Sequence, residues 1–167
     1  MSYRVTKTYG HELGLSACFR QWRATSHCRF LHGYALAFKF VFESDTLDHN
    51  NWVINFGGLK PLKQWLMVTF DHKLVVAEDD PARDVLQGIG GSFYWDDPDS
   101  SFEAIADVLV VPATGCEQFA RMAWEQAQAL LNEWQGRAVG PLQPGVRLVE
   151  VECREHAGNA ASYMGSN

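Results

Sequence analysis

The chain has 167 residues, of which 47% are hydrophobic and 13% aromatic, and its formal net charge is −6. This length favours one domain with a substantial buried core, and the composition excludes an intrinsically disordered chain. Because nucleic-acid phosphates are bound by clustered Lys and Arg, the negative charge argues against a nucleic-acid partner. Arg20, Arg23 and Arg29 form one loose basic cluster, which could hold a small anion or consist of ordinary solvated charges.

The start of the chain carries no recognisable export signal. Residues 1–10 are polar and mixed, and no apolar run reaches membrane-spanning length. The four cysteines form no CxxC pair, which favours free thiols over a disulfide framework. We therefore expect a cytoplasmic protein without a membrane partner.

Alternating hydrophobicity predicts two neighbouring strands in the first part of the chain. Residues 2–19 place apolar side chains at odd positions, and Gly10 and Gly14 predict bulges or a bend. Residues 34–43 alternate more strictly, with phenylalanines along one face. The polar connection 20–30 joins the two strands, so we expect an antiparallel pair.

Two later segments have the hydrophobic spacing of amphipathic helices. Residues 56–68 follow Asn55, which can cap a helix. Residues 114–134 begin with Thr114 and Glu117 at the spacing of a capping box. Both segments predict helices with one apolar face.

The remaining chain supplies a strand and an insertion. Residues 146–155 alternate as a strand, whereas residues 78–107 are rich in Gly and acidic side chains. The acidic run 96–99 does not have EF-hand spacing, so we expect a solvated insertion rather than a calcium site. The order of elements predicts an α+β fold in which two helices pack on an antiparallel sheet, with residues 1–167 as one domain.

Chemically competent side chains occur at Cys28, Asp71, His72, His32 and Glu155. Each has an ordinary structural explanation, such as a buried thiol, a polar turn or a solvated carboxylate. The strand parity of His32 and Glu155, however, places both on the apolar side of their strands. An inward carboxylate requires a partner, and a ligand with adjacent N–H donors would satisfy it.

Five short segments follow one another in a characteristic order. They are Leu15 to Arg20 with Cys28 to Tyr34, Trp52 to Lys60, Phe70 to Leu74, Pro112 to Glu117, and Glu155 to Tyr163. In this order they resemble the 6-pyruvoyl and 6-carboxytetrahydropterin synthases over nearly the whole chain, apart from the insertion at 78–107.

The resemblance implies the tunnelling fold (T-fold), in which a four-stranded antiparallel sheet carries two helices on one face. Trimers close into a barrel and usually stack into a homohexamer, and the active site lies between subunits. The implied activity is that of a carbon–oxygen or carbon–carbon lyase, acting on the reduced pterin 7,8-dihydroneopterin triphosphate. By the family pattern Cys28 is the general base, and Asp71 and His72 form a relay with it. A thiolate and an imidazole can move protons near neutral pH.

The resemblance also indicates how the substrate is held. Glu155 is expected to bind the guanidine-like edge of the pterin through a two-point hydrogen bond. Thr114 and Glu117 lie at the position that holds another part of the ring. Arg20 and Arg23 are candidates for contact with the triphosphate.

The cofactor implied by the resemblance is zinc bound by three histidines, and here the chain departs from the pattern. The three positions are Phe19, His32 and Tyr34, so that only one imidazole remains. A catalytic zinc site needs three protein ligands plus water, and Phe supplies no donor. We therefore do not expect zinc bound in the family manner.

Three interpretations stay open. The first is a metal-independent or altered-metal enzyme of 6-carboxytetrahydropterin synthase type, in which Tyr34 donates a hydrogen bond or His27 replaces a ligand. The second is a sister activity that uses the same proton-transfer residues. The third is a non-catalytic pterin-binding oligomer. Retention of Cys28 with Asp71 and His72 favours an enzyme, and analogy with bacterial relatives favours the queuosine (7-deazaguanine) pathway.

Overall fold

The structure is a computed structural model that describes residues 1–91, 104–135 and 144–165. The strands of this part are β1 (Tyr3–Tyr9), β2 (Leu15–Phe19), β3 (His32–Ser44), β4 (Lys73–Ala77), β5 (Asp107–Val111), β6 (Arg147–His156) and β7 (Asn159–Tyr163). The α-helices are α1 (Lys60–Phe70), α2 (Arg83–Gly88) and α3 (Cys116–Gln135), and the short 3-10 helices are η1 (His11–Leu13), η2 (His27–Arg29) and η3 (Phe56–Leu59).

The described strands form one mixed sheet of seven strands in the order β5-β4-β2-β3-β6-β7, with β1 also paired to β3. The expected four-stranded antiparallel sheet is therefore wrong for this chain. Strand β4 runs parallel to β2, and β5 runs parallel to β4. These two strands were missed because each is a short, continuous apolar run, which periodicity cannot distinguish from a piece of buried helix.

The predicted N-terminal strand is divided at the expected place. Its two parts, β1 and β2, both pair antiparallel with β3, as the sequence predicted. Between them the chain makes the 3-10 turn η1, and Gly14 follows in the left-handed conformation at φ 76°. Glycine adopts this conformation without steric cost, so the bend is encoded at that residue.

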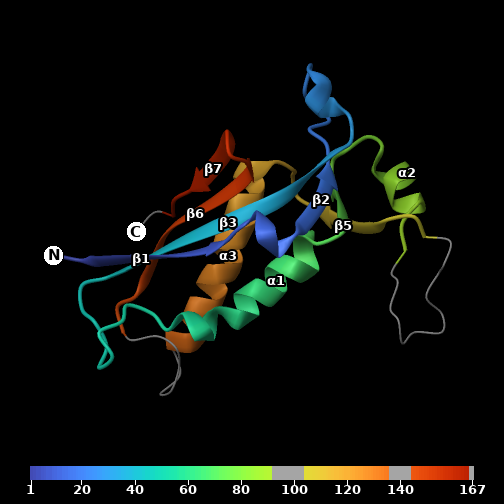
Figure 1. Cartoon of the computed structure of the whole chain (residues 1–167). Coiled ribbons are helices and arrows are strands. Elements are labelled where there is room, and N and C mark those ends of the chain that lie inside the picture. The colour runs from blue at the N-terminus through green and yellow to red at the C-terminus, as the bar shows by residue number, and fades with distance from the viewer. Residues whose placement is uncertain (92–103, 136–143, 166–167) are drawn as a thin grey trace, which may run out of the picture.

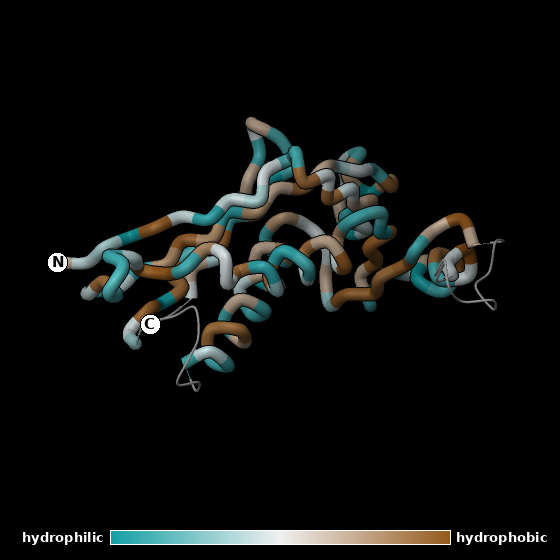
Figure 2. The backbone as a smooth tube through the Cα atoms, turned by 60° about the horizontal axis from the view of Figure 1, so that its bottom comes forward, coloured by the Kyte–Doolittle hydropathy of each residue, from teal (hydrophilic) through white to brown (hydrophobic). Residues whose placement is uncertain are grey.

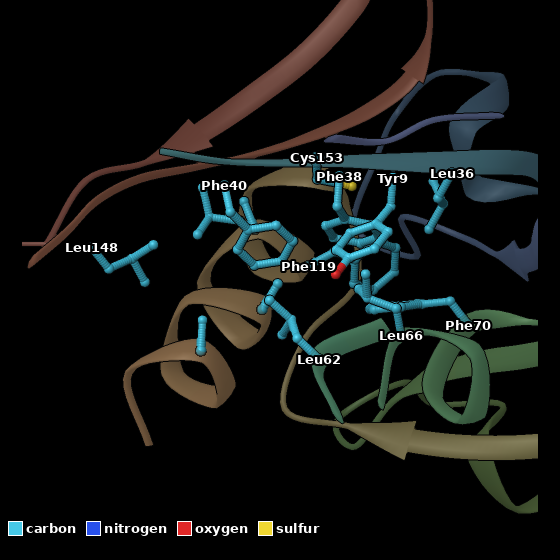
Figure 3. Packing of buried hydrophobic residues seen from close by; sticks show 14 of the residues in the cluster. Tyr9, Leu36, Phe38, Phe40, Leu62, Leu66, Phe70, Phe119, Leu148 and Cys153 are labelled. Carbon is cyan, nitrogen blue, oxygen red and sulfur yellow. The ribbon is translucent and has the colours of Figure 1, made fainter. Parts of the chain in front are cut away.

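The core lies between β3 and the two longer helices (Figure 3). The alternating side chains Leu36, Phe38 and Phe40 are fully buried, which confirms the predicted face of β3. The ring of Phe38 stacks on Phe70 of α1 at 5.1 Å, and Phe70 meets Phe119 of α3 at 5.2 Å. Figure 1 shows α1 and α3 on the same side of the sheet, as expected from the two apolar helix faces.

The helix starts differ in detail from the prediction. The side chain of Asn55 accepts a hydrogen bond from the N–H of Gly57 at 2.9 Å, so it does cap this segment, but the first turn is the 3-10 helix η3. Helix α3 begins at Cys116, one residue later than an N-cap at Thr114 requires. The predicted capping box is therefore wrong, and the hydroxyl of Thr114 instead donates to the carbonyl of Arg20 at 2.7 Å.

The predicted solvated insertion is partly ordered structure. Its described residues contain α2 and a bridge between Gly90 and Ala106 that leads into β5. The acidic run 96–99 lies outside the described residues. Figure 2 shows hydrophobic and hydrophilic positions alternating along the chain. Within the described part, no helix is long and apolar enough to cross a membrane.

Candidate functional site

A cavity of about 450 Å³ lies where the loop between β2 and β3, the start of α3 and the turn between β6 and β7 meet. We call it the Cys28 pocket. Its lining residues are Gln21, His27, Cys28, His32, Tyr34, Cys116, Glu117, Glu155, Gly158, Asn159, Ala160 and Ala161. Four of the predicted site positions, Cys28, His32, Glu117 and Glu155, therefore share one cavity.

Cys28 is half-buried in the single turn of η2. Ser26 caps this turn, since its hydroxyl oxygen accepts a hydrogen bond from the N–H of Cys28 at 3.4 Å. The carbonyl of Cys28 accepts from the N–H of Gln21 at 2.9 Å, which closes the loop on itself. The thiol thus sits on a short, hydrogen-bonded turn rather than on an open loop.

The three positions that correspond to the family's zinc ligands lie together. The register pairs Phe19 with His32, and their rings are 5.1 Å apart, while Tyr34 lies edge-on to His32 at 5.6 Å. The ring of Phe19 is buried and also contacts Phe119 of α3 at 5.0 Å. An aromatic cluster therefore occupies the place that the family pattern assigns to metal ligands.

These residues do not fit zinc bound by three imidazoles. Phe19 has no donor atom, and the Nδ1 of His32 is 2.7 Å from the carbonyl of Phe30, so this nitrogen carries the proton and only Nε2 can bind a ligand. Among the residues that the structure describes, no group of three or more His, Cys, Asp or Glu is arranged to hold a metal ion.

Tyr34 presents a neutral hydroxyl-bearing ring to the Cys28 pocket. Partial burial raises the pKa of its phenol above the ordinary value, and the nearby carboxylate of Glu155 raises it further. Its ring also lies 6.0 Å from that of His156. The hydroxyl of Tyr34 therefore stays protonated at neutral pH and can donate a hydrogen bond to a bound molecule.

Glu155 lies near the end of β6, two residues after the fully buried Cys153. It lines the Cys28 pocket on the same face of the strand, as its parity predicted. The side-chain amide of Asn159, across the turn to β7, donates to its Oε2 at 3.5 Å. This long single bond leaves carboxylate lone pairs for the N–H groups of a ligand.

The other two predicted substrate-binding residues behave differently from one another. Glu117 lies in the first turn of α3 and lines the Cys28 pocket, where the partial positive charge of the helix start favours an anionic side chain. Thr114 is buried, does not line the pocket, and holds the backbone of Arg20. Thr114 thus stabilises the loop between β2 and β3 through this hydrogen bond.

Asp71 and His72 lie elsewhere. His72 lines a second cavity of about 350 Å³ together with Cys18, Gly33 and Lys73, which we call the His72 pocket. Within one chain the structure does not bring this pair into the Cys28 pocket. Side chains along β2 and β3 alternate between the face that the helices cover and the open face. Phe19 and Tyr34 lie on the helix-covered face, and Cys18 and Gly33 lie on the open face. The two pockets are therefore on opposite faces of the sheet.

The Asp71–His72 pair is nevertheless formed. The Nδ1 of His72 is 2.6 Å from Oδ1 of Asp71, and the imidazole is 87% exposed. His72 has a φ of 55°, in the left-handed region, where the chain turns from α1 into β4. An aspartate that orients an imidazole in this way is a proton-relay arrangement. The other ring nitrogen of His72 is left for a group outside this chain.

The two arginines considered for triphosphate binding are engaged by carboxylates. Arg20 pairs with Asp80 at 2.5 Å, and Arg23 pairs with Asp79 at 2.5 Å. Both acids follow β4 in the segment that was expected to be a solvated insertion. The guanidinium of Arg20 is thus engaged by a buried carboxylate, whereas contact of the exposed Arg23 with the triphosphate stays a prediction.

Two pocket residues were missed from the sequence. Gln21 lines the Cys28 pocket and lies so close to Gly115 that a Cβ there would come within 2.0 Å of its amide nitrogen. Asn159 follows the two-residue turn at Ala157 and Gly158, since His156 pairs with Asn159. Gly158 in this turn is the local signal for a hairpin that would have predicted β7 and placed Asn159 beside Glu155.

The comparisons with known proteins decide the family. The model of the 6-pyruvoyl tetrahydropterin synthase family matches residues 10–166. The chain belongs to this family. It is also similar to the 6-carboxy-5,6,7,8-tetrahydropterin synthase of Aquifex aeolicus, with 24% identity over 104 residues, which are 56% of this chain and 64% of that protein. The match thus spans less than two thirds of that relative.

Solved structures show the T-fold of the family. A protein of Wolinella succinogenes described as uncharacterized superposes with a TM-score of 0.77 at 17% identity, covering 99% of both chains. The 6-pyruvoyl tetrahydropterin synthase of Plasmodium falciparum superposes with a TM-score of 0.63 at 13% identity, covering 97% of this chain and 96% of that one. The expected T-fold is confirmed by these likenesses, although the chain has more strands than the four that were expected.

Proposed function

We propose that the protein is a 6-carboxytetrahydropterin synthase-like lyase that converts 7,8-dihydroneopterin triphosphate, or a related reduced pterin, by proton transfer and side-chain cleavage. The observation that carries the proposal is the Cys28 pocket, in which a thiol and a carboxylate with free lone pairs line one cavity. Membership of a family of pterin synthases supports it, as does the name of the Aquifex aeolicus relative.

The pocket provides complementary groups for a pterin ring. Glu155 offers two carboxylate oxygens to the planar N–H edge of the ring, and Glu117 and Gln21 lie on other parts of the lining. In this arrangement Cys28 faces the side chain of the bound pterin and acts as the general base. A positioned acid–base group of this kind contributes about 10²–10⁴-fold to a rate.

The relay partners of Cys28 come, in our proposal, from a neighbouring subunit. Asp71 and His72 are paired and exposed on the opposite face of the sheet, where a second copy of the chain can approach them. A head-to-tail arrangement places the His72 pocket of one copy against the Cys28 pocket of the next, and a closed ring of such contacts gives a trimer. We propose this trimer, and its stacking into a hexamer, as the active form.

No step of the proposed mechanism passes through zinc, because the residues at Phe19, His32 and Tyr34 do not fit it. The phenol of Tyr34 instead donates a hydrogen bond to the substrate's side-chain hydroxyl. We expect elemental analysis of protein purified without chelator to find much less than one zinc per subunit. About one zinc per subunit would contradict this assignment and direct attention to His27 and Cys28 as ligands.

The cellular setting is proposed by analogy only. The name of the Aquifex aeolicus relative favours a place in queuosine (7-deazaguanine) biosynthesis. We accordingly propose a cytoplasmic enzyme of this pathway.

A second candidate function is a pterin-binding T-fold oligomer without turnover. The observation that favours it is the aromatic cluster of Phe19, His32 and Tyr34 at the family's metal position. The two candidates agree on pterin binding and differ on chemistry, so turnover separates them.

The test uses the full-length protein with 7,8-dihydroneopterin triphosphate and identifies the product by mass spectrometry. We expect turnover in the wild type and a loss of about 10²-fold or more in Cys28→Ala and Cys28→Ser, because a serine hydroxyl is too weak a base to replace a thiolate. Pterin binding, followed by fluorescence, should be retained in both variants. Binding without turnover in the wild type, unchanged by either substitution, establishes the binding oligomer instead.

A further inference from the structure

The loop that carries Cys28 is attached to a distant part of the chain through Arg20. The Nε and Nη2 atoms of Arg20 donate to the two carboxylate oxygens of Asp80 at 2.7 and 2.5 Å, across a sequence separation of 60 residues. The side chain of Asp80 is 1% exposed and that of Arg20 is 23% exposed. A guanidinium fork on a buried carboxylate fixes orientation as well as distance.

Asp80 is itself held rigidly. It follows β4, its N–H donates to the carbonyl of Ala77, and its Oδ1 accepts from the N–H of Ala82 at 2.8 Å. The Arg20 guanidinium, together with the Ala82 N–H, holds the pKa of Asp80 below the ordinary range, so the carboxylate is charged at neutral pH. The anchor point for Arg20 is therefore part of the sheet framework.

Arg20 also connects the two ends of the Cys28 loop. Its carbonyl accepts from the buried hydroxyl of Thr114 at 2.7 Å, and its Nη1 donates to the carbonyl of Arg29 at 3.5 Å. The next residue, Gln21, donates its N–H to the carbonyl of Cys28 at 2.9 Å. The side chain and the carbonyl of Arg20 together thus connect the loop to the end of β4 and to the segment before α3.

A second ion pair beside the first provides a natural comparison. Asp79 accepts from the indole of Trp22 at 3.0 Å and from Arg23 at 2.5 Å. The side chains of Arg23 and Asp79 are 67% and 42% exposed, and exposed pairs of this kind contribute little because water screens them. Asp79 and Asp80 therefore both bind the same loop, but Asp80 is buried and Asp79 is exposed.

We propose that Arg20 and Asp80 are a positioning pair that holds Cys28 in its working place opposite Glu155. The inference rests on the proposed function, since it concerns the same site. Glu155 is carried by β6 and does not depend on this pair, so loosening the loop leaves the pterin-binding side of the pocket in place. A displacement of the thiol by about 1 Å is expected to lower turnover by up to about 100-fold.

The experiment compares Asp80→Asn with Asp79→Asn in the full-length protein. It measures kcat and KM with 7,8-dihydroneopterin triphosphate, and the rate at which iodoacetamide alkylates Cys28, located by peptide mass spectrometry. For Asp80→Asn we expect kcat to fall by about 30- to 100-fold with KM within about threefold, and alkylation of Cys28 to accelerate by about tenfold. For Asp79→Asn we expect all three to stay within about twofold.

Arg20→Lys provides a second variant if Asp80→Asn does not fold. It keeps the positive charge but removes the two-point hydrogen bond to Asp80, so we expect the same changes in kcat, KM and alkylation. A variant that only melts at a lower temperature, with kcat and Cys28 alkylation unchanged at 25 °C, overturns the proposal. Equal effects of Asp80→Asn and Asp79→Asn overturn it as well. If the wild type shows no turnover, the proposed function fails, while the alkylation contrast still decides whether the pair holds the Cys28 loop.

Discussion

The Cys28 pocket and the His72 pocket share strand β3 but lie on opposite faces of the sheet, and only the His72 pocket is also lined by β2. The Cys28 pocket is backed by buried aromatic rings and carries Glu155, so it is suited to hold a flat ring. The His72 pocket presents an imidazole that is 87% exposed and already oriented by Asp71. Each pocket has what the other lacks, and our proposal combines the two from different copies of the chain.

Apart from removal of the thiol, we expect the largest effect in the Cys28 pocket to be a loss of substrate affinity. Glu155→Gln removes the charge that receives the pterin N–H groups, and a hydrogen bond to a charged group contributes about 1.5–3 kcal/mol, so we expect affinity to fall about 10- to 100-fold. Titration with a reduced pterin measures it. Glu150→Gln is the control, because Glu150 lies on the same strand and is engaged by Lys39 and Ser162. Equal affinity in the two variants would remove Glu155 from the binding site.

For Tyr34→Phe we expect a smaller loss of turnover, which does not depend on pH. Because burial raises the pKa of Tyr34, its phenol stays protonated up to the ordinary tyrosine value of about 10 and can donate a hydrogen bond but does not act as a base. We expect turnover to fall about tenfold, by an amount that is the same from about pH 6 to pH 9. Rate profiles of the two proteins over this range measure the ratio. A ratio that grows steadily with pH would identify Tyr34 as a base, against our assignment.

The smallest expected change is in the stability of the His72 variants, which belong to the other pocket. His72 occupies the left-handed region at φ 55°, which glycine adopts freely, so His72→Gly is expected to raise the free energy of unfolding by about 1 kcal/mol. Urea denaturation measures the change. His72→Asn should leave stability nearly unchanged, because Asn tolerates this conformation. Both variants should lose turnover; a fully active His72→Gly would separate His72 from catalysis.

The sequence predicted the parts of the fold that depend on local pattern. The phenylalanine face of β3 and the cap at Asn55 follow from spacing and side-chain chemistry, and both are present. The parallel strands β4 and β5 were missed because a short apolar run carries no periodicity. Pairing of Lys73 with Asp107 and of Val75 with Leu109 is set by tertiary structure alone.

Four lining residues of the Cys28 pocket, namely Cys28, His32, Glu117 and Glu155, were predictable from the sequence, but the arrangement of the pocket was not. Strand parity placed His32 and Glu155 on the pocket side, and the family resemblance supplied Cys28. The sequence did not show that Arg20 pairs with Asp80 at a separation of 60 residues, because such ion pairs leave no local signal. For the same reason Arg20 was considered an anion ligand, although its guanidinium is already occupied.

The most direct test of the composite site is subunit mixing. Cys28→Ala and His72→Ala are each expected to be inactive alone; they are dissociated together, reassembled in equal amounts and assayed with 7,8-dihydroneopterin triphosphate. In a head-to-tail ring, random mixing gives an intact Cys28 facing an intact His72 at about one quarter of the interfaces, so about a quarter of wild-type activity should return. A reassembled mixture that stays as inactive as its components would contradict the claim that the two pockets meet across subunits.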